Sequence, residues 1–436
     1  MISTKTFLHY AITITIILLV GGLAGWYYFL NKQKQAISTS DTGRGLDSPA
    51  PAFGGSTGSN YSNVSGTISD GTPVNQAKAP PRIWQVTKTP VAGMGFVTST
   101  SSAATTSAAQ LYFVERATGY ILKADTETSL ISRLTNKLFA RTYEASFSSD
   151  GSVVLRSIDD RGNITSFAGD NPLQSAATAS TSPTNSKELA GGPLSGKYLE
   201  PNIRMIVPMQ KTRELLLLIP NAGGGSSVVL SSWNGIKQKT LFSSPLAGWK
   251  LFSLSDGRIF LSLLPSDDAA GYAFELKNGT LVPRLRNIPG LTFLPRTSSD
   301  AVLFGESSGR LSLFSSAKEG AERVYLPLQT VADKCVWAPL NAPLRRASGE
   351  RLIAYCAVPQ YVASSNFLMD WYRGALRTSD SWWRIDTATG EVTPLLETEE
   401  TDKVFDVENP IIDSSGEQIA FMDAKDKSLW LLRITQ

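Results

Sequence analysis

The segment Phe147-Ser-Ser-Asp-Gly-Ser-Val-Val-Leu-Arg156 joins a polar turn to a strongly apolar strand. Related phrases return at 252–261, 297–304, 347–355 and 413–421, and these later copies are about 45–65 residues apart. Gly and Asp supply the backbone angles that tight turns need, and Val, Ile, Phe and Tyr suit a packed strand. A period of this length marks a repeated supersecondary unit. Because the units are β-strands, the repeat predicts a β-propeller.

Each unit has an apolar strand, a Ser/Asp/Gly turn, a strongly apolar second strand, another turn and a third strand. The second strands count the units, and seven copies start near Leu111, Val153, Leu215, Ile259, Val302, Leu352 and Ile419. No long segment of this region has helical periodicity, which argues against an α/β fold. We therefore expect an all-β propeller of about seven four-stranded blades, with about six to eight compatible with the spacing.

The last repeat ends directly after its third strand, so its blade lacks an outer strand. The segment Arg82-Ile-Trp-Gln-Val-Thr87 precedes the first repeat and has the composition of a strand. We expect this segment to pair with the C-terminal blade and close the ring. Closure would remove an unpaired strand edge.

Residues 7–30 form a run of 24 residues without a charged side chain. About 20 such residues span a bilayer as a helix. The run is longer than the apolar core of a signal peptide, roughly 7–15 residues, and no convincing cleavage site follows Leu30. We expect a short tail at 1–6 and a transmembrane helix at 7–30, and a cleaved signal peptide is the alternative. The charges on the two sides of the run do not decide its orientation.

Residues 31–80 are rich in Ser, Thr, Gly, Asn and Pro and have few large apolar side chains. Such a composition cannot offset the entropy cost of ordering, so it predicts a flexible tether. Residues 81–436 remain for the propeller domain. This domain has 36 basic and 35 acidic residues and no run of Lys or Arg, so we expect no nucleic-acid partner.

The chain has a single histidine, His9, which lies within the predicted anchor. The propeller domain therefore lacks the imidazole that Ser-His-Asp and Cys-His catalysis require. Zinc sites built on histidine are excluded for the same reason, and two cysteines cannot form a four-cysteine site. We expect a protein that is not an enzyme and that uses no metal or cofactor.

The two cysteines are Cys335 and Cys356. If their segments are adjacent antiparallel strands of one blade, the thiols can face each other and form a disulfide. Two buried reduced thiols are the alternative. A disulfide would indicate an oxidising, extracytoplasmic compartment.

The insertion at 359–381 departs from the repeat period and is rich in aromatic residues. Aromatic and Arg side chains often anchor binding interfaces. The candidate binding residues of this surface loop are Tyr361, Asp370, Trp371, Tyr372 and Arg373. The alternative is a loop that folds its aromatic side chains against the neighbouring blade edge.

The stretch Pro410-Ile-Ile-Asp-Ser-Ser-Gly-Glu-Gln-Ile-Ala-Phe421, followed by Lys427-Ser-Leu-Trp-Leu-Leu432, resembles the WD40-like (PD40) repeat of TolB-type periplasmic propellers. The turn proline of that repeat is missing from every copy here. The resemblance covers most of 82–436 and implies a propeller fold and, as in TolB-like relatives, a role in protein contacts at the cell envelope. It carries over no functional residues. The arrangement is also similar to membrane-anchored propeller proteins of uncharacterised bacteria.

We expect a single-pass, membrane-anchored, extracytoplasmic propeller that acts as a binding or scaffolding module at the cell envelope. Its expected partners are the lipid bilayer, through residues 7–30, and a protein or glycan at the envelope. The alternative is a glycan-active enzyme that works without histidine, in which carboxylates from several blades face one another in the central channel. A third possibility, a scaffold that faces the cytoplasm, would leave both cysteines reduced.

Overall fold

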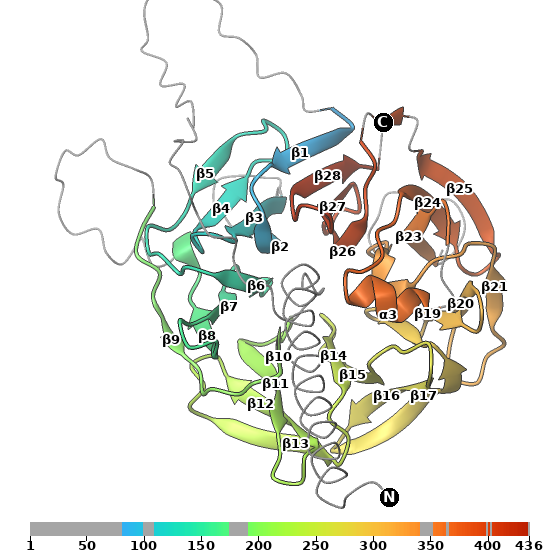
Figure 1. Ribbon diagram of the computed structural model, residues 1–436, viewed down its shortest axis with the longest axis horizontal. Helices are drawn as coiled ribbons and strands as arrows, with labels where there is room; N and C mark the ends of the chain where they lie inside the picture. Colours follow the sequence, from blue (N-terminus) through green and yellow to red (C-terminus); the bar gives the residue numbers. More distant parts are fainter. Residues whose placement is uncertain are drawn as a thin grey trace, which may run out of the picture.

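The computed structural model describes residues 81–98, 109–173, 191–340, 352–362, 366–397, 400–401 and 403–434. Within these ranges the strands form seven four-stranded antiparallel sheets, arranged as a ring (Figure 1). The predicted all-β propeller of four-stranded blades is therefore confirmed. The predicted tail, transmembrane helix and tether at 1–6, 7–30 and 31–80 lie outside the described residues. Among the residues that are described, no helix is long and apolar enough to cross a membrane.

Every blade runs from an inner strand, next to the centre of the ring, to an outer strand at its rim (Figure 1). The inner strands are β2 (Val91–Thr98), β6 (Thr142–Phe147), β10 (Met205–Pro208), β14 (Trp249–Ser253), β18 (Thr292–Pro295), β22 (Cys335–Trp337) and β26 (Val407–Ile412). The second strands are β3 (Ala109–Glu115), β7 (Val153–Ile158), β11 (Glu214–Pro220), β15 (Ile259–Leu263), β19 (Val302–Ser307), β23 (Ile353–Pro359) and β27 (Gln418–Asp423). Each contains or adjoins one of the seven start points expected from the sequence.

The third strands are β4 (Ile121–Ala124), β8 (Ile164–Gly169), β12 (Ser226–Ser232), β16 (Ala270–Lys277), β20 (Leu311–Ser316), β24 (Asp380–Asp386) and β28 (Leu429–Arg433). The outer strands are β5 (Ile131–Arg133), β9 (Gly196–Tyr198), β13 (Gln238–Ser244), β17 (Thr280–Pro289), β21 (Val324–Leu326), β25 (Glu391–Leu396) and β1 (Ile83–Thr87). We number the blades 1 to 7 from the one that contains β2.

The second strands are continuously apolar because a neighbouring blade covers each of their faces. In β11, Leu215 and Leu217 pack toward blade 2, whereas Leu216 and Leu218 pack toward blade 4. All four leucine side chains are buried. Successive strand residues point to opposite faces, so a strand buried on both sides needs apolar residues at consecutive positions.

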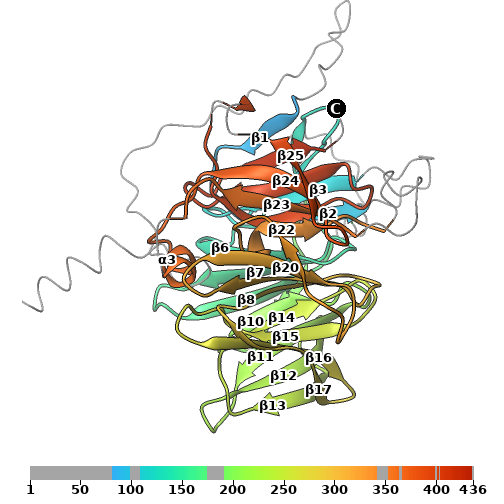
Figure 2. The same cartoon turned by 90° about the vertical axis from the view of Figure 1, so that its right-hand side faces the viewer.

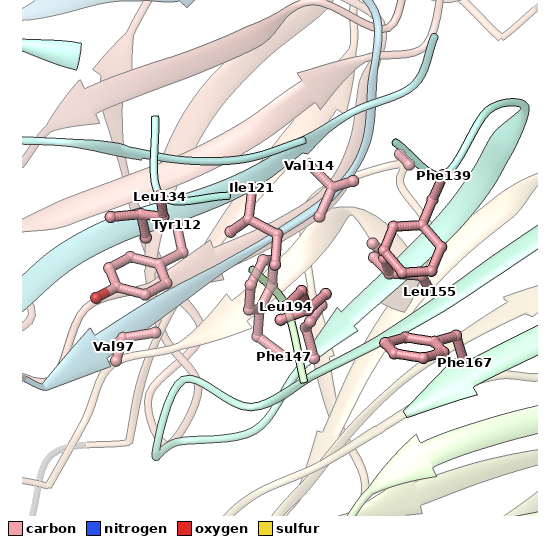
Figure 3. Packing of buried hydrophobic residues seen from close by; sticks show 13 residues of the cluster. Val97, Tyr112, Val114, Ile121, Leu134, Phe139, Phe147, Leu155, Phe167 and Leu194 are labelled. Atoms are coloured by element: carbon pink, nitrogen blue, oxygen red, sulfur yellow. The ribbon is translucent and has the colours of Figure 1, made fainter. Parts of the chain in front are cut away.

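The core of the propeller consists of such clusters between neighbouring blades. Figure 3 shows the cluster between blades 1 and 2, where Tyr112 and Ile121 of blade 1 meet Phe147, Leu155 and Phe167 of blade 2. The rings of Tyr112 and Phe147 pack edge to face with their centroids 6.2 Å apart. Aromatic pairs of this geometry favour a defined packing between the two sheets.

The ring closes through β1, as the sequence predicts. β1 pairs with β28 in antiparallel register, with Ile83 opposite Leu432 and Trp84 opposite Leu431. Blade 7 therefore contains three strands from the C-terminal end of the propeller and one strand from its N-terminal end. This pairing gives β28 a partner along the edge that would otherwise be open.

The Asp-Gly turns connect the inner and second strands. Asp150 Oδ1 accepts a hydrogen bond from the backbone N–H of Ser152 at 2.8 Å, and Gly151 has a φ of +85°. In the last copy, Asp413 Oδ1 accepts from the backbone N–H groups of Glu417 and Gln418 at 2.9 and 2.8 Å. The aspartates thus close the turns, and glycine supplies the left-handed backbone conformation.

The two faces of the ring carry different connections. Neighbouring strands of a blade are antiparallel and connected in order. Turns between the first and second strands therefore lie on one face, which we call the turn face. The helix α3 (Phe367–Tyr372) lies in the connection from β23 to β24, on the opposite side, which we call the α3 face (Figure 2). β1 begins opposite the last residues of β28, so the chain enters the ring at the turn face.

Candidate functional site on the α3 face

The insertion at 359–381 contributes α3, which covers the inner ends of several blades (Figure 1). Phe367, Leu368 and Trp371 are buried in a cluster with Leu311 of blade 5 and Val331. The backbone N–H of Met369 donates to Asp267 Oδ2 at 2.9 Å, which reaches the β15–β16 connection of blade 4. The insertion therefore begins in blade 6 and extends across blade 5 to blade 4.

The close approach of α3 to the ring depends on a glycine between blades 4 and 5. Gly290 has a φ of +58°, and a Cβ built on it would lie 2.4 Å from Ser307 Cβ and 2.9 Å from Leu368 Cδ1. Both the backbone conformation and the available space therefore require glycine at this position.

Lys334 lies at the centre of a buried ionic cluster beneath α3. Its ammonium lies 2.5 Å from Asp380 Oδ2 and 3.0 Å from Asp406 Oδ1. It also donates to Thr378 Oγ1 at 2.8 Å. Lys334 and Asp380 have fully buried side chains, and the side chain of Asp406 is 2% exposed.

Trp371 joins α3 to this ionic cluster. Lys334 Nζ lies 4.9 Å from the centroid of the Trp371 ring, and the indole N–H donates to Asp406 Oδ1 at 3.1 Å. An ammonium over an aromatic face is attracted by the ring. Buried charges require partners of this kind, because leaving one of them unpaired costs several kcal/mol. The cluster therefore holds α3 in one position.

The protonation of Asp380 is perturbed by its surroundings. Burial raises the pKa of Asp380 above its ordinary value, and Lys334 and the backbone N–H of Val407 oppose this effect. Within the described residues, Asp380 Oδ1 has no hydrogen-bond partner. The ion pair with Lys334 and the hydrogen bond from Val407 therefore both use Oδ2 of Asp380.

A second set of contacts fixes the end of α3 toward the centre of the ring. The 3₁₀ helix η1 (Ala332–Lys334) precedes β22 and carries Asp333. Asp333 accepts a hydrogen bond from the Tyr372 hydroxyl at 2.8 Å and forms an ion pair with Lys250 of the inner strand β14. Blades 4 and 6 are thus connected through one carboxylate.

The disulfide expected between Cys335 and Cys356 is present. The two cysteines lie directly opposite each other in β22 and β23, with their Cα atoms 4.1 Å apart. Cys335 follows Lys334, and Cys356 lies three residues before Pro359, where β23 ends. The disulfide therefore links the strands beside the ionic cluster and the start of the insertion.

The five predicted binding residues differ in their exposure to solvent. Tyr361 is 78% exposed, and Arg373 is also exposed. Asp370 and Tyr372 are half-buried, and Trp371 is 2% exposed. The insertion thus combines an inward aromatic face on α3, as in the alternative left open by the sequence, with the exposed side chains of Tyr361 and Arg373, which lie outside the helix. A binding role for this surface stays a prediction.

The residues that hold this surface in place could not be identified from the sequence. These are Lys334, Asp333, Thr378, Asp380, Asp406 and Lys250. The sequence contains one indication of them, a charged residue between apolar neighbours: Asp406 stands between Phe405 and Val407. Such a signal indicates a buried ion pair but does not identify the partner.

Carboxylates on the inner strands are engaged by basic side chains. Glu144 Oε2 of β6 lies 2.7 Å from Arg156 Nη1, and Glu408 Oε2 of β26 lies 2.6 Å from Lys427 Nζ. Burial raises the pKa of Glu144, and Arg156 opposes the change. In the ranges that the structure describes, no group of three or more His, Cys, Asp or Glu side chains is placed to hold a metal ion. The geometry favours structural pairing over paired-carboxylate catalysis at these positions.

No protein-family model matches the chain. No curated protein matches it either. Oligogalacturonate lyase of Vibrio parahaemolyticus has a similar fold, with a TM-score of 0.49 and 7% identity over 81% of this chain and 94% of that chain. TolB of Acinetobacter baumannii has a TM-score of 0.36 and 9% identity over 74% and 61% of the two chains. The tricorn protease has a TM-score of 0.47 and 9% identity over 82% of this chain and 34% of that one.

This chain therefore corresponds to about a third of the tricorn protease and to less than two thirds of TolB. At these levels of identity, the similarity extends to the fold alone. The fold defines the chain as a seven-bladed β-propeller. Membership of the WD40-like repeat family stays a prediction.

Proposed function

We propose that this propeller is a binding module at the cell envelope that contacts a protein partner through its α3 face. The supporting observation is that α3 is fixed from below by Lys334 and Trp371 while Tyr361 and Arg373 remain exposed. A helix that is already fixed in place loses little conformational entropy on binding. Exposed Tyr and Arg are also among the side chains that contribute most to binding energy.

The α3 face also carries exposed apolar side chains. They lie in the connections around the ring: Leu138, Leu246, Leu264, Tyr361 and Val404. Leu264 is 55% exposed, and its connection contains Asp267, which contacts α3. Leu264 therefore adds apolar contact area beside α3.

The described part of the chain begins on the face opposite α3. The chain enters the ring through β1 at the turn face, opposite α3. In our proposal, residues 7–30 anchor the chain in the bilayer and residues 31–80 form a flexible tether. In this proposal the tether joins the propeller at the turn face, on the side opposite α3.

Site-specific photocrosslinking tests the binding surface. A photoreactive phenylalanine analogue at Tyr361 should yield a discrete crosslinked product in cells, and Arg373→Glu should abolish that product. The matched control is the same analogue at Tyr325, which is 52% exposed on the outer strand β21. Equal products from the two positions, or a product unaffected by Arg373→Glu, would contradict a site on the α3 face.

The disulfide supports the extracytoplasmic part of the proposal, because disulfides persist in oxidising compartments. The test is thiol labelling of the full chain in native membranes, with and without reductant. Labelling of Cys335 and Cys356 only after reduction is the expected result. Labelling without reductant would instead favour a scaffold that faces the cytoplasm.

A further inference from the structure

A second site lies at the rim of the turn face, between blades 2 and 3. Here the structure contains a pocket of about 500 Å³. Its walls come from the end of β8, the start of β9, the turn after β10 and the end of β12. Pockets of roughly 300–1,000 Å³ accommodate small ligands. The turn face is opposite α3, so this pocket is separate from the proposed protein-binding surface.

Hydrogen-bond donors dominate the polar lining of this pocket. Arg213 pairs with Asp170 through Nη2, and the side chain of Arg213 remains 50% exposed. Lys197 lies on the exposed edge strand β9, and no described residue accepts a hydrogen bond from its ammonium. Two cations and one carboxylate line the pocket, which leaves a surplus of positive charge.

Neutral groups complete the lining. Asn234 Oδ1 accepts from Ser232 Oγ at 2.8 Å and from the backbone N–H of Ile236 at 3.2 Å. These contacts orient the Asn234 amide so that its NH₂ group remains a donor. Trp233 contributes an apolar wall, and its indole N–H is already used by the Gly169 carbonyl oxygen at 3.2 Å.

These features define the chemistry of a matching ligand. Arg and Lys donors bind carboxylate, sulfate or phosphate oxygens through charge-assisted hydrogen bonds. Asp170 and Asn234 offer an acceptor and a donor for hydroxyl groups, and the tryptophan offers an apolar contact. A sugar ring with an anionic substituent combines all three properties.

We propose that the pocket between blades 2 and 3 binds an acidic saccharide, with Lys197 and Arg213 contacting its anionic group and Asp170 and Asn234 its hydroxyl groups. This site goes beyond the proposed protein-binding role and does not depend on it. It would give the propeller two ligands on opposite faces.

Ligand-observed NMR with the full chain tests this site. The probes are uronate-containing, sulfated and phosphorylated oligosaccharides, each with its neutral counterpart, and sodium sulfate. The acidic saccharides should bind more tightly than the neutral ones. Lys197→Gln combined with Arg213→Gln should weaken their binding roughly tenfold or more. Higher salt should weaken it further.

The matched control is Lys318→Gln combined with Arg310→Gln, which removes the same charge from exposed positions in blade 5. This variant should bind like the wild type. The proposal would be overturned if acidic and neutral saccharides bound with equal affinity, or if sulfate alone bound as tightly as the acidic saccharides. It would also be overturned if no probe bound, or if both variants lost the same affinity. Photocrosslinking at Tyr361 should be unaffected by the pocket variant, so the two proposals can fail separately.

Discussion

Trp371 donates its indole N–H to Asp406 Oδ1 at a distance of 3.1 Å. Trp371 belongs to the insertion between two strands of blade 6, whereas Asp406 immediately precedes the inner strand of blade 7. This contact connects a surface helix to a buried carboxylate that also binds Lys334. The position of the helix therefore depends on the polar core beneath it.

Replacing Trp371 with Phe tests this dependence. Trp371→Phe removes the indole donor and part of the buried ring, which should cost about 2 kcal/mol. Because this loss of stability is confined to α3 and its contacts, we expect amide hydrogen exchange in α3 to become about thirty times faster. Exchange in the inner strands should change little. Trp84→Phe, at a half-buried position of β1, is the control and should not alter exchange in α3. Unchanged α3 exchange in Trp371→Phe would exclude this coupling.

Lys334→Met should destabilise the propeller strongly. The substitution leaves Asp380 and Asp406 buried without their counter-ion, and such unpaired charges cost about 3–5 kcal/mol. We expect the melting temperature, measured by circular dichroism, to fall by about 5 °C or more. Lys318→Met removes an exposed charge and should change it by less than about 1 °C. Similar melting temperatures for the two variants would show that the cluster contributes little.

The raised pKa of Asp380 predicts the sign of a pH effect. The folded state holds the proton of this carboxyl more tightly than the unfolded state does. The contribution of Asp380 to stability should therefore fall as pH rises above its unfolded pKa of about 3.9, until the folded pKa is passed. The free energy of unfolding of the wild type relative to Asp380→Asn should decrease over this window, as measured by denaturant unfolding. An increase with pH would mean that Lys334 outweighs burial.

Removal of the disulfide should lower stability without changing the fold. The two cysteines are separated by 21 residues, and a cross-link of this span contributes roughly 3 kcal/mol by restricting the unfolded chain. Combined Cys335→Ala and Cys356→Ala should therefore lower the denaturant midpoint. Reductant should lower the midpoint of the wild type but leave that of the double variant unchanged. A wild-type midpoint that does not respond to full reduction would contradict this prediction.

Ring closure can be disrupted from the outer strand of blade 7. Val86 is buried on β1, so Val86→Asp places an unpaired charge in the core between blades 7 and 1. We expect a lower melting temperature and, because the edge of β28 becomes exposed, a larger oligomeric fraction in size-exclusion chromatography. Lys88→Asp introduces the same side chain at an exposed position just after β1 and is the control. Equal behaviour of the two variants would show that β1 is dispensable.

Much of this architecture could be predicted from local patterns in the sequence. The phrase ending at Arg156 marks a turn and a buried strand, and the run that starts at Leu215 requires cover on both faces. The segment at 82–87 was expected to close the ring, and it pairs with β28. The pairing of Cys335 with Cys356 was expected only if their segments were adjacent strands, and the structure shows that they are. These features depend on residues within one repeat or on a regular spacing.

The candidate site could not be predicted in the same way. The sequence placed Trp371 and Arg373 in one loop but did not show that the first side chain is buried and the second exposed. That difference depends on Lys334 and Asp406, which belong to other parts of the ring. The sequence by itself determined the repeat and its turns, because strand periodicity and turn chemistry are local. It predicted the closing strand, and it left the two cysteines as either a disulfide or two reduced thiols. Only the tertiary structure decided which side of the insertion faces solvent, because distant charges become neighbours only when the ring is closed.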